Sequence, residues 1–180
     1  MQNESKLHVD QFLTFRISGS EFAIPIGKVR EIIQYEGLTR VPHVPPCIRG
    51  VINLRGGVVP VIDLGVKFGI GDRAICSSTC TVIVDATNEG QRSVMGILAD
   101  GVCEVIGLAP EEIEAPPEFG TAVKVEYLSG LGKSGSGFAL ILDIDRVLSH
   151  SELLGRRDGA ASGVSRPASV QETAPAGADT

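Results

Sequence analysis

Short β-rich runs that end at glycine or asparagine turns recur along most of the chain, and they constrain its fold more than any other feature. Valine, isoleucine, phenylalanine and threonine favour a pleated strand, and glycine accepts the positive φ that tight hairpin turns require. Three pairs of these runs are separated by short turns and predict three hairpins: 12–17 with 21–24, 51–54 with 58–63, and 81–85 with 93–98. The pattern therefore predicts a mainly β fold of short antiparallel strands.

Two further features refine the predicted strands. The run 138–144 predicts a late strand, and the glycine-rich segment 130–137 before it is typical of a flexible hairpin loop. Pro60 interrupts an otherwise strong strand pattern. Because proline has no N–H to donate to a neighbouring strand, we expect the strand that holds Pro60 to lie at a sheet edge or to be bulged.

The sequence also predicts two short surface helices. Val29, Ile32 and Ile33 lie at i, i+3 and i+4 within the segment 27–35, which is the spacing of one apolar helix face. A second group of apolar residues in 147–154 predicts the other helix. We expect each helix to pack one face on the β-sheet core.

Composition divides the 180 residues into three zones. Residues 1–10 are polar and predict a flexible N-terminal arm, whereas 11–154 form a dense apolar body. Residues 155–180 are rich in alanine, glycine, serine, proline and threonine. Such a segment buries too little apolar surface to offset the entropy of ordering, so we expect a disordered tail.

Charge and hydropathy disfavour two classes of partner. The formal net charge is -6, whereas nucleic-acid binding relies on clustered lysine and arginine, so we expect no nucleic-acid partner. The N-terminus has no basic segment followed by an apolar stretch, and no apolar run approaches the ~18 residues that cross a bilayer. We therefore expect a cytoplasmic protein that does not insert directly into a membrane.

Motifs for catalysis, cofactors and metals are weak in this sequence. It contains no GxSxG, GxxxxGK[ST] or HExxH motif, and a strand rather than a helix follows Lys133 and Ser134 in the glycine-rich segment. The four cysteines form no CxxC pair, and the three histidines are scattered. We expect no enzyme activity, no cofactor and no metal site; a catalytic thiol at Cys47 with His43 remains a minor alternative.

Four segments, in matching order and spacing, resemble the CheW family of chemotaxis coupling proteins: FLTFRISGSEFAIPIGKVREII at 12–33, RGVINLRGGVVPVIDLGVKFG at 49–69, GILADGVCEVIGL at 96–108 and EYLSGLGKSGSGFALILDIDRVL at 126–148. The segment at 49–69 resembles the family signature of a strand, an Arg-Gly turn, a second strand and a short helix. The resemblance implies two intertwined five-stranded SH3-like β-barrels with one or two short helices, formed as two β-subdomains by residues 11–154.

The same resemblance implies a non-catalytic adaptor in chemotaxis signal transduction. Members of this family couple chemoreceptors, the methyl-accepting chemotaxis proteins, to the histidine kinase CheA. The expected partners are the regulatory domain of a CheA-type kinase and the cytoplasmic tip of the receptors, and the expected location is the cytoplasm, with recruitment to membrane-associated receptor arrays. A paralogous coupling protein of a non-flagellar chemosensory pathway, and a small-molecule-sensing β-barrel, remain alternatives.

The resemblance also assigns candidate binding residues. Those for kinase or receptor binding surround the Asn-Leu-Arg-Gly turn: Glu31, Asn53, Arg55 and Gly56. Arginine suits this role because its planar guanidinium bonds in bidentate fashion to carboxylates, although an exposed ion pair by itself contributes only about 0–1 kcal/mol to stability. Those for a receptor groove between the barrels are Leu13, Ile26, Val29, Ile32, Ala99, Asp100 and Gly101. Core packing is an equal alternative for Val29 and Ile32.

Overall fold

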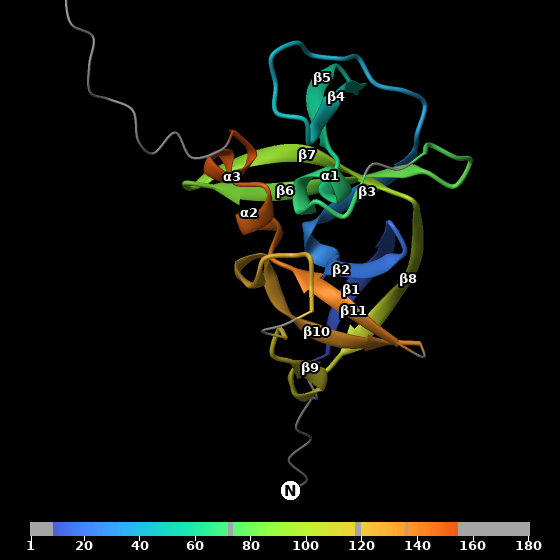
Figure 1. The fold of residues 1–180 in the computed structure, drawn as a ribbon, viewed down its shortest axis with the longest axis vertical. Helices are drawn as coiled ribbons and strands as arrows, with labels where there is room; N and C mark the ends of the chain where they lie inside the picture. The colour runs from blue at the N-terminus through green and yellow to red at the C-terminus, as the bar shows by residue number, and fades with distance from the viewer. Residues whose placement is uncertain (1–8, 72–73, 118–119, 136, 155–180) are drawn as a thin grey trace, which may run out of the picture.

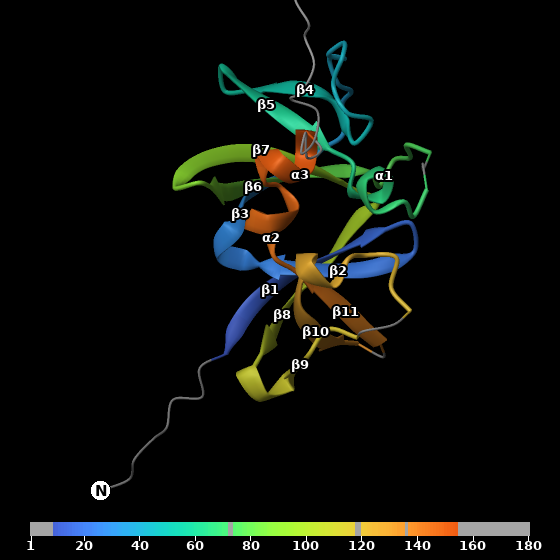
Figure 2. The ribbon, with the colours of Figure 1, turned by 60° about the vertical axis from the view of Figure 1, so that its left-hand side comes forward.

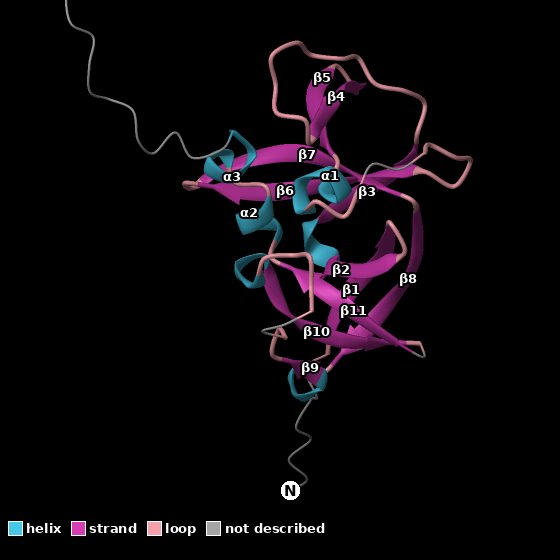
Figure 3. Cartoon of the chain, in the orientation of Figure 1, coloured by secondary structure: helices cyan, strands magenta, loops and turns pink. Residues whose placement is uncertain are grey.

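The chain folds into two curled β-sheets that are stacked along the long axis of the molecule (Figure 1). The structure is a computed structural model, and it describes residues 9–71, 74–117, 120–135 and 137–154. The short helices gather mostly near the level where the two sheets meet (Figure 3). The predicted mainly β fold is confirmed, and the two curled sheets are consistent with SH3-like barrels.

The first sheet, at the bottom of Figure 1, has the strand order β8-β1-β2-β11-β10-β9. Its strands are β1 (Asp10–Ile17), β2 (Ser20–Pro25), β8 (Gly101–Leu108), β9 (Ile113–Glu114), β10 (Leu128–Ser134) and β11 (Gly137–Leu142). β1 and β2 form the first predicted hairpin, with Phe15 opposite Phe22. The sheet exceeds the predicted five strands because β9 adds two residues at its edge.

The second sheet has the strand order β3-β6-β7-β5-β4. Its strands are β3 (Val29–Gln34), β4 (Ile48–Leu54), β5 (Gly57–Ile62), β6 (Cys80–Asn88) and β7 (Gln91–Ala99). β4 with β5, and β6 with β7, form the other two predicted hairpins. β3 and β4 are the two end strands of this sheet, and the candidate site lies where these two strands face each other.

The two sheets are intertwined along the sequence (Figure 2). The chain builds β1 and β2 in the first sheet, passes to the second sheet for β3 to β7, and returns to the first sheet for β8 to β11. Neither sheet is therefore a continuous stretch of sequence, and the two sheets are intertwined as the family resemblance implies.

Three short α-helices and three 3-10 turns are found within the described residues: α1 (Leu64–Phe68), α2 (Ile144–Val147), α3 (His150–Leu154), η1 (Ile26–Lys28), η2 (Pro110–Glu112) and η3 (Val125–Tyr127). α1 follows β5, as the family resemblance implies, and α3 lies within the predicted helical segment 147–154. Across the same described ranges, no helix combines the length and apolar character needed to cross a membrane.

The predicted helix at 27–35 is wrong. Its first residues complete the 3-10 turn η1, and the rest forms strand β3, which pairs with β6. The helical spacing arises from a β-bulge, because the register shifts between Val29 and Glu31. Val29 lies opposite Val84 and Ile32 opposite Val82, so both side chains lie on one face of the sheet although they are three residues apart.

The glycine-rich segment 130–137 is also different from the prediction. Most of it belongs to strand β10, which ends at Ser134, and β11 begins at its last residue, Gly137. A β-carbon at Gly132 would lie 2.3 Å from Leu108 Cδ1, so glycine permits close packing inside the first sheet. These glycines therefore allow dense packing rather than a long loop.

The strand that holds Pro60 was expected at a sheet edge or with a bulge; it is not an edge strand, and the register shift in its pairing with β4 falls on the β4 side, between Ile48 and Gly50. That strand, β5, lies between β7 and β4. Pairing with β7 begins only at Val61, while Pro60 lies opposite Val51 of β4. Proline is tolerated because its missing N–H lies beyond the segment that pairs with β7.

One large core cluster joins the two sheets. It includes Phe15 and Phe22 from the first sheet and Val82 and Ile97 from the second, all fully buried. Burying each large apolar side chain contributes about 1.5–3 kcal/mol. A smaller cluster lies within the first sheet and contains Phe12, Ala23, Leu108, Ala139 and Ile141.

Candidate functional site

The β4–β5 turn presents Arg55 to solvent. Arg55 and Gly56 have φ values of 51° and 86°, so both central residues of the turn adopt the left-handed conformation typical of tight hairpins. The Gly56 N–H donates to Asn53 Oδ1 at 2.9 Å, which holds the turn closed. Asn53 and Gly56 therefore fix the backbone that carries Arg55, whose side chain is 81% exposed.

Arg55 forms an ion pair with Glu31 of β3. Arg55 Nη2 donates to Glu31 Oε2 at 3.1 Å, and the Glu31 side chain is 27% exposed. The structure thus brings together the four residues predicted around the Asn-Leu-Arg-Gly turn. Because Arg55 is well exposed, the pair stabilises the fold by only about 0–1 kcal/mol, and most of its guanidinium remains accessible to a partner.

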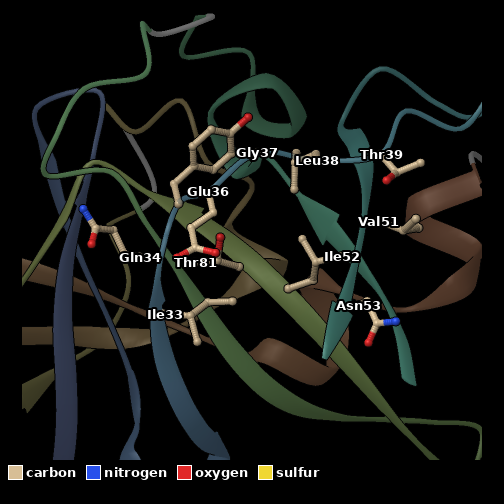
Figure 4. Close-up of a pocket in the computed structure, with 11 residues that line it drawn as sticks. Ile33, Gln34, Glu36, Gly37, Leu38, Thr39, Val51, Ile52, Asn53 and Thr81 are labelled. Carbon is tan, nitrogen blue, oxygen red and sulfur yellow. The ribbon is translucent and has the colours of Figure 1, made fainter. Parts of the chain in front are cut away.

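A cavity of about 640 Å³ lies between the end strands β3 and β4 (Figure 4). The side chains of Ile33 and Ile52 extend toward the space between their strands (Figure 4). Farther along, the backbones of Thr39 and Val51 exchange two hydrogen bonds of 2.9 Å. This backbone bridge and the Arg55–Glu31 pair both span the opening between the two end strands.

The predicted groove residues from η1 and β3 lie at the boundary of the main core. Ile26 and Val29 are partly buried and pack against the core cluster that joins the sheets. Ile32, on the same face as Val29, is 45% exposed. These three residues supply the exposed apolar part of the predicted groove.

Leu13 and Ala99 belong to the core instead. Their exposed fractions are 3% and 0%, and both lie in the cluster shared by the two sheets. Leu13 is paired across β1 and β8 with Val105, which is half-exposed. The sequence did not single out Val105, although Val105 lies in the segment 96–108 that resembles the family.

Asp100 and Gly101 hold the connection between β7 and β8. The Asp100 carboxylate accepts a hydrogen bond from the Ser18 N–H at 2.6 Å, and the Asp100 N–H donates to the Arg16 carbonyl at 2.9 Å. Gly101 lies opposite Arg16 in the β1–β8 ladder. Both residues therefore anchor the crossing of the chain between sheets, at the β1–β2 turn.

Charged residues beside the exposed face of β3 are paired. Arg30 donates to Asp85 at 2.7 Å, and this hydrogen bond lowers the pKa of the Asp85 carboxyl and raises the pKa of Arg30. Lys28 of η1 binds both carboxylate oxygens of Asp145, at 2.7 and 3.0 Å. These pairs fix the N-terminal end of the strand that carries Glu31.

The remaining candidate chemistry finds little support in the geometry. Burial raises the pKa of the Cys47 thiol, which opposes the activation that a catalytic thiol requires. Across the described ranges, no three histidine, cysteine, aspartate or glutamate side chains gather in a group suited to a metal ion.

Most of the chain is similar to known proteins. The family model of the CheW-like domain matches residues 11–152. The protein named "Chemotaxis protein CheW" from Klebsiella aerogenes is 41% identical over 143 residues, covering 79% of this chain and 84% of that protein. "Protein FrzA" from Myxococcus xanthus is 31% identical over 139 residues, covering 77% of this chain and 84% of that protein.

A solved structure has the same fold. The crystal structure of the scaffolding protein TtCheW from Thermoanaerobacter tengcongensis matches with a TM-score of 0.69 and 29% sequence identity. The match covers 80% of this chain and 90% of that one. The two intertwined sheets are therefore shared with a known scaffolding protein.

Proposed function

This chain belongs to the CheW-like domain family, and from that membership we propose that it is a non-catalytic adaptor that couples chemoreceptors to a CheA-type histidine kinase. Membership itself makes the chain a scaffold or coupling protein of chemotaxis. The finer proposal names its two partners, the regulatory domain of the kinase and the cytoplasmic tip of the receptor. It also implies a cytoplasmic protein that is recruited to receptor arrays.

The observation that carries the proposal is the exposed Arg55 on a rigid turn. The Asn53–Gly56 hydrogen bond fixes the backbone of the turn, and the Arg55 guanidinium donates to Glu31 at 3.1 Å. A preorganised arginine loses little side-chain entropy when it binds a carboxylate of a partner, and arginine is enriched among residues that dominate binding energy. We assign Glu31, Asn53, Arg55 and Gly56 to kinase or receptor binding on this basis.

The apolar boundary between the sheets supplies the second proposed contact. Ile32 is exposed, and Val29 and Ile26 lie beside it at the edge of the core. Branched apolar side chains suit the binding of an amphipathic helical tip in a groove. In this proposal Asp100 and Gly101 support the groove by holding the β7–β8 crossing, and Leu13 and Ala99 contribute from beneath it through packing.

Titration calorimetry with the regulatory domain of a CheA-type kinase from the same cell tests the first contact. We expect Arg55→Ala to weaken binding at least about tenfold, which corresponds to about 1.4 kcal/mol. Arg92, an exposed arginine of β7, provides the matched control, since Arg92→Ala should bind as the wild type does. Equal binding by wild type and Arg55→Ala would remove the turn from the kinase contact.

The receptor contact needs a separate measurement. Ile32→Ser should weaken binding to a receptor-tip fragment while kinase binding persists, because Ile32 is exposed to solvent beside the partly buried Val29. Phe138→Ser is the control, since Phe138 is an apolar residue of similar exposure that lies in β11 of the first sheet. Unchanged receptor binding by Ile32→Ser would exclude the proposed groove.

Two alternatives each have one supporting observation. The likeness to Protein FrzA, a relative with a name other than CheW, supports a paralogous coupling protein. The 640 Å³ cavity between β3 and β4 falls within the size range of ligand pockets and favours a small-molecule-sensing barrel. A melting temperature that rises with an added metabolite would support the sensing barrel, because a ligand that binds only the folded state stabilises it.

A further inference from the structure

The 3-10 turn η1 carries part of the proposed receptor contact but has little packing of its own. Ile26 begins this turn and Val29 follows it, and both pack against the main core only in part. No residue of the turn is fully buried, and a β-carbon at Gly27 would meet nothing within 4 Å. A single turn of 3-10 helix also gains few hydrogen bonds of its own. The position of η1 therefore depends on a contact from outside the turn.

Lys28, the last residue of η1, makes that contact with Asp145. Its Nζ donates to both carboxylate oxygens of Asp145, at 2.7 and 3.0 Å. The two side chains are 33% and 36% exposed, so water screens their charges only in part. Charge-assisted hydrogen bonds of this kind are shorter and stronger than neutral ones. The contact ties η1 to a helix that lies 117 residues away in the sequence.

That helix, α2, holds Asp145 firmly in place. Asp143 caps it by accepting from the Arg146 N–H at 3.2 Å. Ile144 and Val147 lie three residues apart on one face, and both are buried in the main core. Because a close-packed core resists displacement, α2 cannot move without disturbing that core. Asp145, in the first turn of α2, therefore carries a carboxylate at a fixed place.

The same carboxylate also bonds to the second sheet. Asp145 Oδ1 accepts from the backbone N–H of Thr87 in β6 at 2.7 Å. β6 pairs with β3, the strand that begins at Val29, immediately after η1. α2 lies at the level where the two sheets meet (Figure 1). One carboxylate thus fixes η1 relative to α2 and to β6.

The neighbouring ion pair does not hold η1 in this way. Arg30 donates to Asp85 at 2.7 Å, and these residues belong to β3 and β6, which already pair through their backbones. Lys28 instead reaches from the turn, which precedes the ladder between β3 and β6. The contact between Lys28 and Asp145 is therefore the one that acts on the turn itself.

We propose that Asp145 is a positioning residue for the receptor contact, which it serves from α2 by holding η1 through Lys28. The contact sets where Ile26 and Val29 lie at the boundary between the sheets. This inference rests on the proposed receptor groove and adds a residue from outside it. A partner that packs on these apolar side chains binds best when they are already in place, since less order has to be gained on binding.

The test titrates a receptor-tip fragment into the full chain. Lys28→Met keeps the aliphatic length but removes the charge, and we expect it to weaken binding at least about threefold. Lys28→Arg should bind within about twofold of the wild type, because arginine also donates to a carboxylate. Equal weakening by both variants would contradict the proposed pairing. Lys124→Met is the matched control, since it removes another lysine–carboxylate pair, with Glu126 at 3.4 Å, and should bind as the wild type does.

A double-mutant cycle tests whether Asp145 acts through Lys28. Asp145→Asn keeps an oxygen that accepts from the Thr87 N–H but removes the negative charge. Asp145→Asn and Lys28→Met break the same contact, so together they should weaken receptor binding no more than either does alone. Effects that add in the double variant would show that Asp145 does not act through Lys28.

Two further measurements separate positioning from a general loss of stability. The Val29 N–H bonds to the Ile26 carbonyl, and its hydrogen exchange should be at least about threefold faster in Lys28→Met. The regulatory domain of the kinase should bind this variant as it binds the wild type, and a parallel loss of kinase binding would overturn a local role. Failure of the wild type to bind the receptor tip would overturn the proposed receptor contact and this inference with it. Wild-type binding that Lys28→Met leaves unchanged would overturn the positioning role alone.

Discussion

At the scale of single residues, exposure decides whether a charged group serves binding or stability. Arg55 is almost fully exposed, so its pairing with Glu31 orients the side chain more than it stabilises the fold. Asp63 is fully buried: it caps α1 by accepting from the Val66 N–H at 3.2 Å, and it lies 3.9 Å from Arg49. The two carboxylate–arginine pairs have similar chemistry, but removing the buried Asp63 should lower the stability of the fold more than removing the exposed Arg55.

Asp63→Ala should destabilise the protein more than Asp143→Ala does. Asp143 caps α2 in the same manner, through the Arg146 N–H at 3.2 Å, but it is only partly buried. We expect losses of about 2–3 kcal/mol for Asp63→Ala and about 1 kcal/mol for Asp143→Ala, because burial adds an electrostatic loss to the lost cap. Urea unfolding of the two variants measures the difference, and equal losses would show that burial adds nothing.

Cys76 should react with alkylating agents at neutral pH. Its thiol is exposed, and hydrogen bonds from the Ser78 and Thr79 hydroxyls lower its pKa to about 7. The reactive thiolate is therefore already well populated near pH 7 and increases as the pH rises through that value. Iodoacetamide labelling followed by mass spectrometry should give a midpoint near pH 7 for Cys76 and a higher one in Ser78→Ala, with an unchanged midpoint in that variant contradicting the role of the hydroxyl.

At the level of secondary-structure elements, the same arrangement of a bulged hairpin and a short helix occurs in both sheets. In each, an antiparallel hairpin has a bulge near a glycine, at Gly50 in β4 and at Gly130 in β10. The second strand of each hairpin, β5 or β11, then pairs in parallel with an earlier or later strand and leads into an aspartate-capped helix. This repeated arrangement explains why two aspartate caps follow similar apolar runs in the sequence.

Gly50→Ala tests the bulge of the second sheet. Gly50 has φ +156°, and a β-carbon there would lie 2.5 Å from the Thr39 carbonyl oxygen, so the bridge between the end strands must shift. We expect a loss of about 1–3 kcal/mol, since the contacted atom is backbone and cannot rotate away. Gly27→Ala is the control, because a β-carbon there meets nothing within 4 Å and its stability should change little; comparable thermal stability of the two variants would contradict the close approach.

At the scale of the whole molecule, one core makes the two sheets interdependent. The main cluster contains residues of both sheets and of all three α-helices, including Phe15, Val82, Leu64, Val147 and Leu153. The chain also crosses between the sheets twice, so neither sheet can be removed as a contiguous segment. We expect the described domain to unfold as one cooperative unit.

Phe15→Ala should destabilise both sheets together. Phe15 is fully buried and stacks on Phe22 at a centroid distance of 6.3 Å, so its truncation should cost about 3–5 kcal/mol. Hydrogen exchange in urea should accelerate equally in β2 and β6, which belong to different sheets. Phe138→Ala, at a half-exposed position, should have little effect on either strand; acceleration confined to β2 would mean that the sheets unfold separately.

The candidate site was predictable only in part. The resemblance carried by the Asn-Leu-Arg-Gly turn led to Glu31, Asn53, Arg55 and Gly56, and the structure brings these residues together. It also led to Leu13 and Ala99, which the structure buries in the core. A list of candidate residues carries no information on exposure, because exposure depends on which strand from another part of the chain covers each side chain.

The sequence by itself determined the three hairpins and the mainly β class, because strand alternation and turn chemistry act between residues a few positions apart. Only the tertiary structure decided the conformation of 29–34 and the place of Pro60. A bulge against β6 gives Val29 and Ile32 a helix-like spacing within a strand, and Pro60 is tolerated where β5 has not yet met β7. Both outcomes depend on neighbouring strands, β6 and β7, that come from distant parts of the chain. A local sequence pattern contains no information about which distant strand will pair with it.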